Sequence, residues 1–232
     1  MTRSVVLLAG GRSRRLGRDK PLVVIGGWTI LERALEATAA VDDIVLSVRD
    51  PAPHVAVLVG AGWRLPGPET GDDGAFAELL RGTRRLRVVP DPTPDLGPVA
   101  GLAAGLAAAR GDRAVVLATD LPFVTAALVE RLFDALERAP ACDAIVPVVD
   151  GRDQPLLAAY RTRAAAAASR LAAGPDAASP SAAGGGGPSV AELLDALHVV
   201  RIDGAALGPN EEVRRSARGI DTPQDLEWAR GV

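Results

Sequence analysis

The sequence has little that could form a covalent or zinc-held scaffold. Cys142 is the only cysteine, so no intrachain disulfide can form, and this fits a reducing compartment. His54 and His198, the only histidines, lack the partner spacing of a zinc site, so we interpret them as surface or packing residues. The 232 residues suffice for a sizeable hydrophobic core, most simply that of one α/β domain.

The sequence also lacks a long apolar run. No stretch approaches the roughly 20 residues of a membrane helix. The run from Val5 to Ala9 is too short for a signal-peptide core and is followed by charge rather than a cleavage site. We therefore expect a soluble, cytoplasmic protein without a membrane partner.

An excess of positive charge is missing as well, because 26 basic residues stand against 29 acidic ones. Bulk attraction to nucleic acid is therefore not expected. Positive charge is instead concentrated near the start of the chain, in Arg12, Arg14, Arg15, Arg18 and Lys20. Such local charge suits a small anionic ligand.

Short apolar segments alternate with helical patterns along the chain, which predicts a parallel, doubly wound sheet. We expect strands at residues 4–9, 43–47, 87–90, 113–118, 143–149, 155–160 and 199–202. We expect helices at residues 29–40, 99–109, 125–139, 189–197 and 223–229, and a helix or a turn at residues 51–59. Ser189 and Thr222 have the pattern of N-caps for the last two helices.

Residues 174–188 differ from the rest in being nearly all Ala, Gly, Ser, Pro and Asp. This composition buries too little apolar surface to order itself and predicts a flexible loop. Only about 45 residues follow, too few for an ordinary second domain. We therefore interpret it as an insertion in a single domain of residues 1–232.

The segment LLAGGRSRRLGRDKPLV, residues 7–23, follows the first expected strand. Gly10 and Gly11 lack Cβ atoms and allow backbone amides to approach a ligand beyond the carboxyl end of that strand. Charged side chains for phosphate oxygens come from Arg14, Arg15 and Lys20. The spacing fits neither a GxxxxGK[ST] loop nor a GxGxxG fingerprint, and a solvated turn is the alternative.

Two aspartates follow expected strands at the same edge of the sheet. Asp91 follows the strand at 87–90, and Asp120 follows the strand at 113–118. A triphosphate needs a divalent cation, which binds hard oxygen ligands. The two residues are therefore candidates for holding Mg²⁺, the alternative being helix capping or turn formation.

The string LAGGRSRRLGRDK resembles the signature LAGGxSxRxGxDK of the MobA-like nucleotidyltransferases, the family of molybdenum cofactor guanylyltransferase. The resemblance implies a Rossmann-like three-layer α/β sandwich with a mostly parallel sheet, like that of nucleotide-diphospho-sugar transferases. It also implies a nucleoside triphosphate site with Lys20 on the phosphates. The other nucleotide-binding residues that it implies are Leu8, Ala9, Gly10, Gly11, Arg14, Ser47, Asp91, Gly97 and Asp120.

Further segments carry the resemblance. Asp120-Leu121-Pro122 matches a D-x-P segment whose Asp binds magnesium in the family, and residues 97–101 match GPxAG. For Asp91, just before that segment, the resemblance implies a nucleotide or metal contact. Ser47 falls where the family has a polar base contact, although a plain strand-end serine is the alternative.

The acceptor half of the resemblance is less regular. DGRDQPLLAAY, residues 150–160, resembles GRxQPLxAxY and makes Asp153 and Gln154 candidate acceptor contacts, with turn formation as the alternative. Where many members have Asn-x-Asn-Thr-Pro, this chain has Gly219-Ile220-Asp221-Thr222-Pro223. Asp221 is thus a candidate for orienting the acceptor or a metal-bound water, and the acceptor's identity stays open.

The resemblance implies Mg²⁺-dependent nucleotidyl transfer, in which an acceptor phosphate attacks the α-phosphorus and pyrophosphate leaves. Asp120 and Asp91 would hold Mg²⁺, while Arg15 and Lys20 would stabilise the pyrophosphate. The implied substrates are GTP and a molybdopterin-type acceptor, with molybdoenzymes or their chaperones as further partners. Open alternatives are a cytidylyltransferase, a transferase for another phosphorylated acceptor, and a non-catalytic nucleotide- or cofactor-binding delivery module.

Overall fold

The computed structural model describes residues 2–9, 20–66, 76–91, 97–174 and 187–232. Its strands are β1 (Arg3–Leu8), β2 (Val24–Ile25), β3 (Trp28–Thr29), β4 (Asp43–Val48), β5 (Ala77–Arg81), β6 (Arg84–Pro90), β7 (Arg113–Ala118), β8 (Ala144–Val149), β9 (Arg152–Asp153), β10 (Leu157–Arg161) and β11 (Val199–Asp203). Its α-helices are α1 (Ile30–Glu36), α2 (Pro51–Gly60), α3 (Pro98–Ala108), α4 (Ala126–Arg138), α5 (Ala164–Ala172), α6 (Val190–Asp195), α7 (Asn210–Ser216) and α8 (Pro223–Arg230). Two 3₁₀ helices are η1 (Lys20–Leu22) and η2 (Gly204–Leu207).

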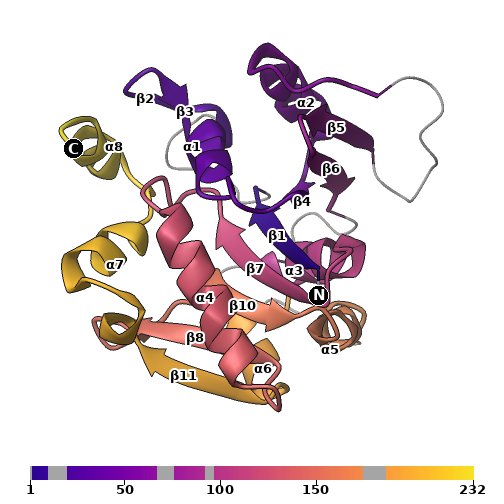
Figure 1. The fold of residues 1–232 in the computed structure, drawn as a ribbon, viewed down its shortest axis with the longest axis vertical. Helices are drawn as coiled ribbons and strands as arrows, with labels where there is room; N and C mark the ends of the chain where they lie inside the picture. Colours follow the sequence, from indigo (N-terminus) through magenta and orange to yellow (C-terminus); the bar gives the residue numbers. More distant parts are fainter. Residues whose placement is uncertain (1, 10–19, 67–75, 92–96, 175–186) are drawn as a thin grey trace.

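One large sheet runs through the molecule in the order β11-β8-β10-β7-β1-β4-β6-β5, with β9 beside β8 (Figure 1). The four central strands β7, β1, β4 and β6 are parallel, whereas β10 and β5 are antiparallel to their neighbours. The carboxyl ends of the central strands therefore meet at one edge. This confirms the predicted α/β class with a mostly parallel sheet.

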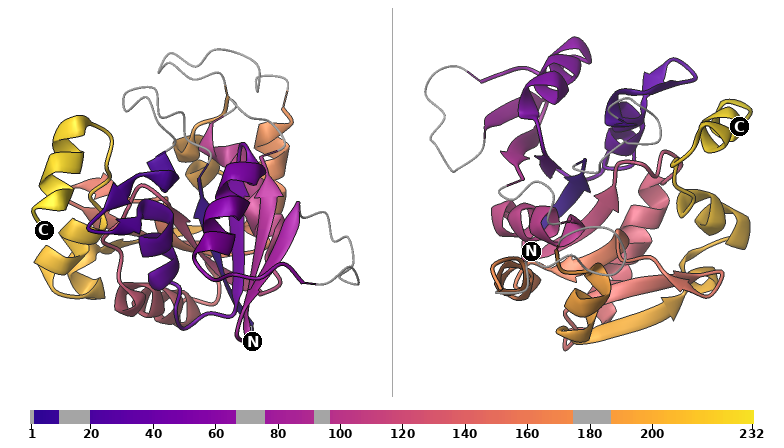
Figure 2. Two further views of the ribbon diagram at one scale, coloured as in Figure 1. Left: turned by 90° about the horizontal axis from the view of Figure 1, so that it is seen from above. Right: turned by 180° about the vertical axis from the view of Figure 1, so that it is seen from behind.

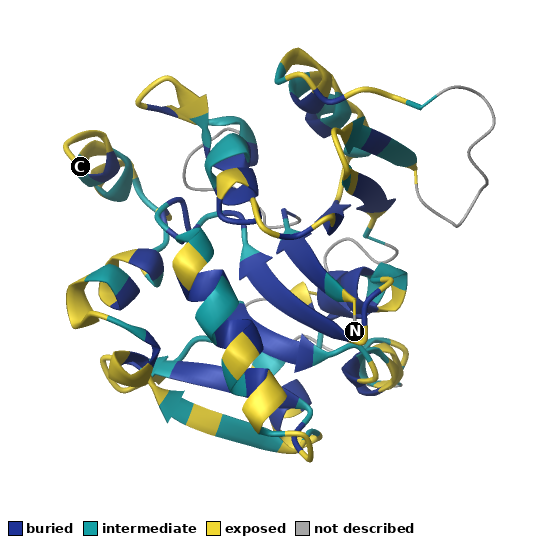
Figure 3. Cartoon of the chain, viewed as in Figure 1, coloured by how far each residue is buried: buried dark blue, intermediate teal, exposed yellow. Residues whose placement is uncertain are grey.

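Helices cover both faces of the sheet (Figure 2). Val5 and Leu7 of β1 belong to one apolar cluster, with residues of α1, α2 and α4. Val6 points to the opposite face, into a cluster with residues of α3, α5 and α6. Since the central strands are buried on both faces (Figure 3), they read as continuous apolar runs in the sequence.

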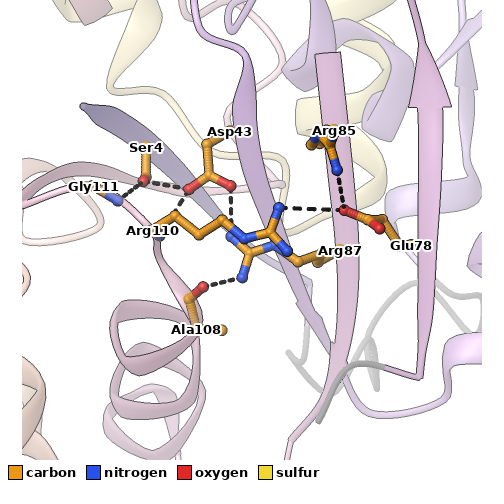
Figure 4. A network of polar contacts seen from close by, with 8 residues as sticks. All are labelled: Ser4, Asp43, Glu78, Arg85, Arg87, Ala108, Arg110 and Gly111. Atoms are coloured by element: carbon orange, nitrogen blue, oxygen red, sulfur yellow. Dashed lines mark hydrogen bonds and ion pairs between the residues drawn. The ribbon is translucent and has the colours of Figure 1, made fainter. Parts of the chain in front are cut away.

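A buried polar network occupies the opposite, amino-terminal edge of the central strands (Figure 4). The Asp43 carboxylate accepts hydrogen bonds from Ser4 Oγ at 2.5 Å, from Arg87 Nη2 at 2.5 Å and from the Arg110 amide at 2.9 Å. The Gly111 amide donates to Ser4 Oγ at 2.9 Å. The network thus ties β1, β4 and β6 to the turn that precedes β7.

Several sequence-based boundaries were wrong. The helix expected at 29–40 ends at Glu36, because the next residues form turns in which Thr38 Oγ1 donates to Leu35 O. The strand expected from residue 87 begins at Arg84, since its polar start pairs with β5 in a hairpin that was not predicted. The strand expected from Pro155 begins at Leu157, whose amide closes a turn onto Gln154 O.

Among the described residues, four helical segments were not predicted at all: η1, α5, η2 and α7. The N-caps, in contrast, were confirmed, because Ser189 and Thr222 each form a capping box with the residue three positions later. Most of the expected loop at 174–188 lies outside the described residues. In the described part of the chain, no helix is both long and apolar enough to cross a membrane.

Candidate functional site

The residues after β1, β4 and β7 are joined by backbone hydrogen bonds at the carboxyl edge. The Ala9 amide donates to Ser47 O at 2.8 Å, and the Thr119 amide donates to Leu8 O at 3.0 Å. Leu8, Ala9 and Ser47, three of the predicted nucleotide contacts, are therefore adjacent. Gly10, Gly11, Arg14 and Arg15 lie outside the described residues.

Lys20, at the start of η1, brings two carboxylates together at this edge. Its Nζ lies 2.5 Å from Asp221 Oδ1 and 3.6 Å from Asp120 Oδ2. The Lys20 side chain is only 15% exposed, whereas that of Asp221 is 62% exposed. The cation is thus held in the site while one of its carboxylates faces solvent.

The position of Asp221 is fixed by the segment around it. The Ile220 amide donates to Asp120 O at 3.0 Å, and the Ile220 side chain is fully buried. The Asp221 amide donates to Asp225 Oδ2 at 3.2 Å, and Asp225 also closes the capping box with Thr222 at the start of α8. The end of the chain therefore contributes directly to the site after β7.

Asp120 has an unusual electrostatic environment for a carboxylate. Burial raises the pKa of Asp120 above its ordinary value, and the nearby charge of Asp221 raises it further, while Lys20 opposes both effects. A second cation near Asp120 would favour the ionised carboxylate. Burial and Asp221 thus disfavour the ionised carboxylate of Asp120, and the Lys20 ammonium favours it.

The segment from Gly97 to Gly101 opens α3 beside Ser47. Gly97 is the N-cap of α3 at φ 83°, a backbone conformation that favours glycine. A Cβ on Gly101 would lie 3.3 Å from Ser47 Oγ, so the start of α3 packs closely on the end of β4. The residues predicted for the nucleoside side are thus close together.

Asp91 lies at the same edge but not beside Asp120. Its amide donates to Val48 O at 2.6 Å, directly after β6. β6 is separated from β7 by β4 and β1, which corresponds to roughly 14 Å between the β6 and β7 axes at about 4.8 Å per strand. The strand order thus separates Asp91 from Asp120, whereas the Ile220 backbone contact brings Asp221 close to Asp120.

Asp153 and Gln154 are engaged in the local structure of β9 and the turn after it. Asp153 Oδ2 accepts from Arg201 Nε at 2.8 Å, and Gln154 Nε2 donates to Arg152 O at 3.3 Å. The turn reaches the site through its backbone, since Leu156 O accepts from the Ala118 amide at 2.8 Å. These contacts agree with the alternative in which both residues form a turn.

Within the described residues, no group of three or more His, Cys, Asp or Glu side chains could hold a metal ion. The site offers the carboxylate pair of Asp120 and Asp221, whose oxygens converge on one cationic nitrogen. Hard oxygens suit Mg²⁺, which commonly takes one or two carboxylates and completes its shell with phosphates and water. The donor set therefore fits a cation that arrives with a triphosphate.

A sequence profile of the MobA-like NTP transferase domain matches residues 5–183. The chain belongs to this family. The match includes Lys20, Asp91 and Asp120, whereas Asp221 lies beyond it.

Two curated relatives are each called a probable molybdenum cofactor guanylyltransferase. The one from Methanosarcina acetivorans is 39% identical over 163 residues, which are 68% of this chain and 64% of the relative, so just under two thirds of the relative is spanned. The one from Methanothermobacter thermautotrophicus is 27% identical over 96% of both chains. The crystal structure of molybdopterin-guanine dinucleotide biosynthesis protein A from Archaeoglobus fulgidus has a TM-score of 0.68 and 26% identity, covering 98% of this chain and 97% of that one.

Sequence reasoning missed the contact between Lys20 and Asp221. The two residues are 201 positions apart, and the motifs assigned them to opposite substrates. The available signal was the departure from the family pattern, because an Asp in place of an amide adds a negative charge that can pair with a lysine.

Proposed function

We propose that this chain is a Mg²⁺-dependent nucleotidyltransferase that transfers GMP from GTP to the phosphate of a molybdopterin-type acceptor. The observation that carries the proposal is the pairing of Lys20 with Asp120 at the carboxyl edge of a MobA-like fold. The names of the two relatives support guanine as the base and the molybdenum cofactor as the acceptor.

In the proposed reaction, an acceptor phosphate oxygen forms a bond to the α-phosphorus of GTP. The bond from that phosphorus to the oxygen bridging to the β-phosphate breaks, and pyrophosphate leaves. Asp120 would hold Mg²⁺, which when bound neutralises phosphate charge. Lys20, with Arg15, would stabilise the charge that develops on the pyrophosphate. No protein base is needed, since the attacking phosphate is ionised at neutral pH.

We assign the remaining predicted residues to the two substrates, the nucleotide and the acceptor. Leu8, Ala9, Ser47, Asp91 and Gly97 would bind the nucleotide, and Gly10, Gly11 and Arg14 of the loop would contact its phosphates. Because Asp91 lies three strands from β7, the nucleotide role suits it better than a shared metal with Asp120. Asp153 and Gln154 would face the acceptor, and Asp221, beside Lys20, would face both the acceptor and the metal.

A thermal-shift series tests nucleotide binding, with GTP, CTP, ATP and UTP each measured with and without Mg²⁺. A ligand that binds only the native state adds about 2.7 kcal/mol of stability at a hundredfold excess over Kd. We expect a Mg²⁺-dependent shift for GTP alone. A shift for CTP alone would indicate the cytidylyltransferase alternative, and no shift with any nucleotide would contradict the proposal.

A further inference from the structure

Lys20 is the only lysine in the chain, since the other 25 basic residues are all arginine. Arginine and lysine differ in shape, because arginine carries a broad planar fork and lysine a compact ammonium that acts as a point charge. Position 20 is therefore the one place in the chain where the basic side chain is the compact cation.

The geometry around Lys20 is that of a small cation between two anions. Its Nζ lies within 4 Å of a carboxylate oxygen of both Asp221 and Asp120, at 2.5 Å and 3.6 Å. A guanidinium has its charge spread over three nitrogens, so it would not place one compact charge between the two carboxylates as the ammonium does. A divalent metal ion is likewise compact and seeks the same oxygens.

We propose that the Lys20 ammonium and a divalent cation compete for the carboxylates of Asp120 and Asp221. In the ligand-free protein Lys20 occupies the position between them. When metal and triphosphate enter together, the metal replaces the ammonium on the carboxylates and Lys20 moves onto the phosphates. This inference rests on the proposed function for the identity of the triphosphate, but not for the competition itself.

Charge explains why the exchange is more favourable when both ligands are present. A metal ion alone would have to displace the Lys20 ammonium from the two carboxylates or bind beside it. Two positive charges at close range repel each other. A triphosphate supplies new negative charge for Lys20, so the metal and the nucleotide each favour binding of the other. The asparagine of the family pattern in place of Asp221 would leave Lys20 one fewer anion and weaken this coupling.

The test measures the affinity of the protein for Mn²⁺ without nucleotide, by electron paramagnetic resonance of free Mn²⁺. We expect Lys20→Met to bind Mn²⁺ about tenfold more tightly than the unsubstituted protein, because a neighbouring positive charge is removed. Lys20→Arg is the matched control and keeps the charge, so it should show no such gain. Asp221→Asn should bind Mn²⁺ about tenfold more weakly, since one anionic ligand is lost.

A double substitution tests whether the two residues act on each other. If Lys20 competes through Asp221, the gain from Lys20→Met should shrink in the Asp221→Asn background. Equal gains in both backgrounds would overturn the proposal, because the two effects would then be independent.

The lone lysine also gives a direct readout on the unsubstituted protein. After labelling with ¹⁵N-lysine, the side-chain nitrogen of Lys20 should give a single NMR signal. Adding Mg²⁺ should shift this signal, and the shift should be smaller in Asp221→Asn. An unmoved signal, together with unchanged Mn²⁺ affinity in Lys20→Met, would overturn the competition even if the protein turns over GTP. Conversely, absence of turnover with the observed competition would contradict only the proposed function.

Discussion

Asp43 shows at the scale of one residue how charge is stabilised inside this fold. It is 7% exposed and binds the nearly buried Arg87, besides Ser4 and the Arg110 amide. Removing one partner of a buried ion pair leaves the other charge uncompensated, which costs about 3–5 kcal/mol. We therefore expect Asp43→Ala to lower the free energy of unfolding by about this amount in urea denaturation.

The neighbouring Asp42 is the control for this prediction. It is exposed, and its carboxylate accepts a hydrogen bond from Thr83 Oγ1 at 2.8 Å. Asp42→Ala should change the free energy of unfolding by no more than about 1 kcal/mol. Equal losses for the two substitutions would show that the buried network contributes no special stability.

Asp143, just before β8, gives a prediction for pH. Partial burial favours a higher pKa for Asp143. The Asp143 carboxylate, however, accepts hydrogen bonds from Arg163 Nε at 2.7 Å and from the His198 amide at 3.0 Å. These bonds and the charges of Arg163 and His198 hold the pKa of Asp143 below its ordinary value. The ionised carboxylate therefore stabilises the fold above the unfolded pKa of about 3.9, and this stability is lost as the pH falls.

Asp143→Asn should consequently be less stable than the unsubstituted protein near neutral pH. The difference in free energy of unfolding should shrink between about pH 6 and about pH 3, measured by urea denaturation at several pH values. A difference that is constant over this range would show that Asp143 contributes through packing rather than through its charge.

At the scale of an element, α3 depends on small residues for its approach to the sheet. A Cβ on Gly105 would overlap Cγ1 of Val6 in β1. Overpacking of this kind costs about 1–3 kcal/mol, and we expect that loss for Gly105→Ala in thermal or urea denaturation. Gly60→Ala at the end of α2 is the control, because nothing lies within 4 Å of its added Cβ. Comparable losses in both variants would contradict close packing of α3.

Local patterns predicted some elements and not others. The N-caps Ser189 and Thr222 could be recognised because a capping box involves residues three positions apart. β5 could not be recognised, because buried and more exposed residues alternate only weakly along it and its pairing partner β6 starts with arginines. Residues 164–172 are mostly alanine and form α5, whose inner side is defined by its contacts with α3 and α6.

At the scale of the whole molecule, the site combines residues that short motifs do not connect. The position of Asp120 after β7 was predictable from the apolar run before it. The contact of Asp221 with Lys20 depends on the final segment returning to η1, where Ile220 shares a small core with Ile25 and Ile30. The strand order likewise separates Asp91 from Asp120, which no local pattern indicates.

The most direct test of the central claim is pyrophosphate release from GTP, Mg²⁺ and molybdopterin. It compares the unsubstituted protein, Asp120→Asn, and Asp134→Asn as an exposed control on α4. Loss of the carboxylate that we propose as the metal ligand should lower the rate on the order of 100-fold or more, while Asp134→Asn keeps it. Release that is absent from all three proteins, or unaffected by Asp120→Asn, would contradict guanylyl transfer at this site.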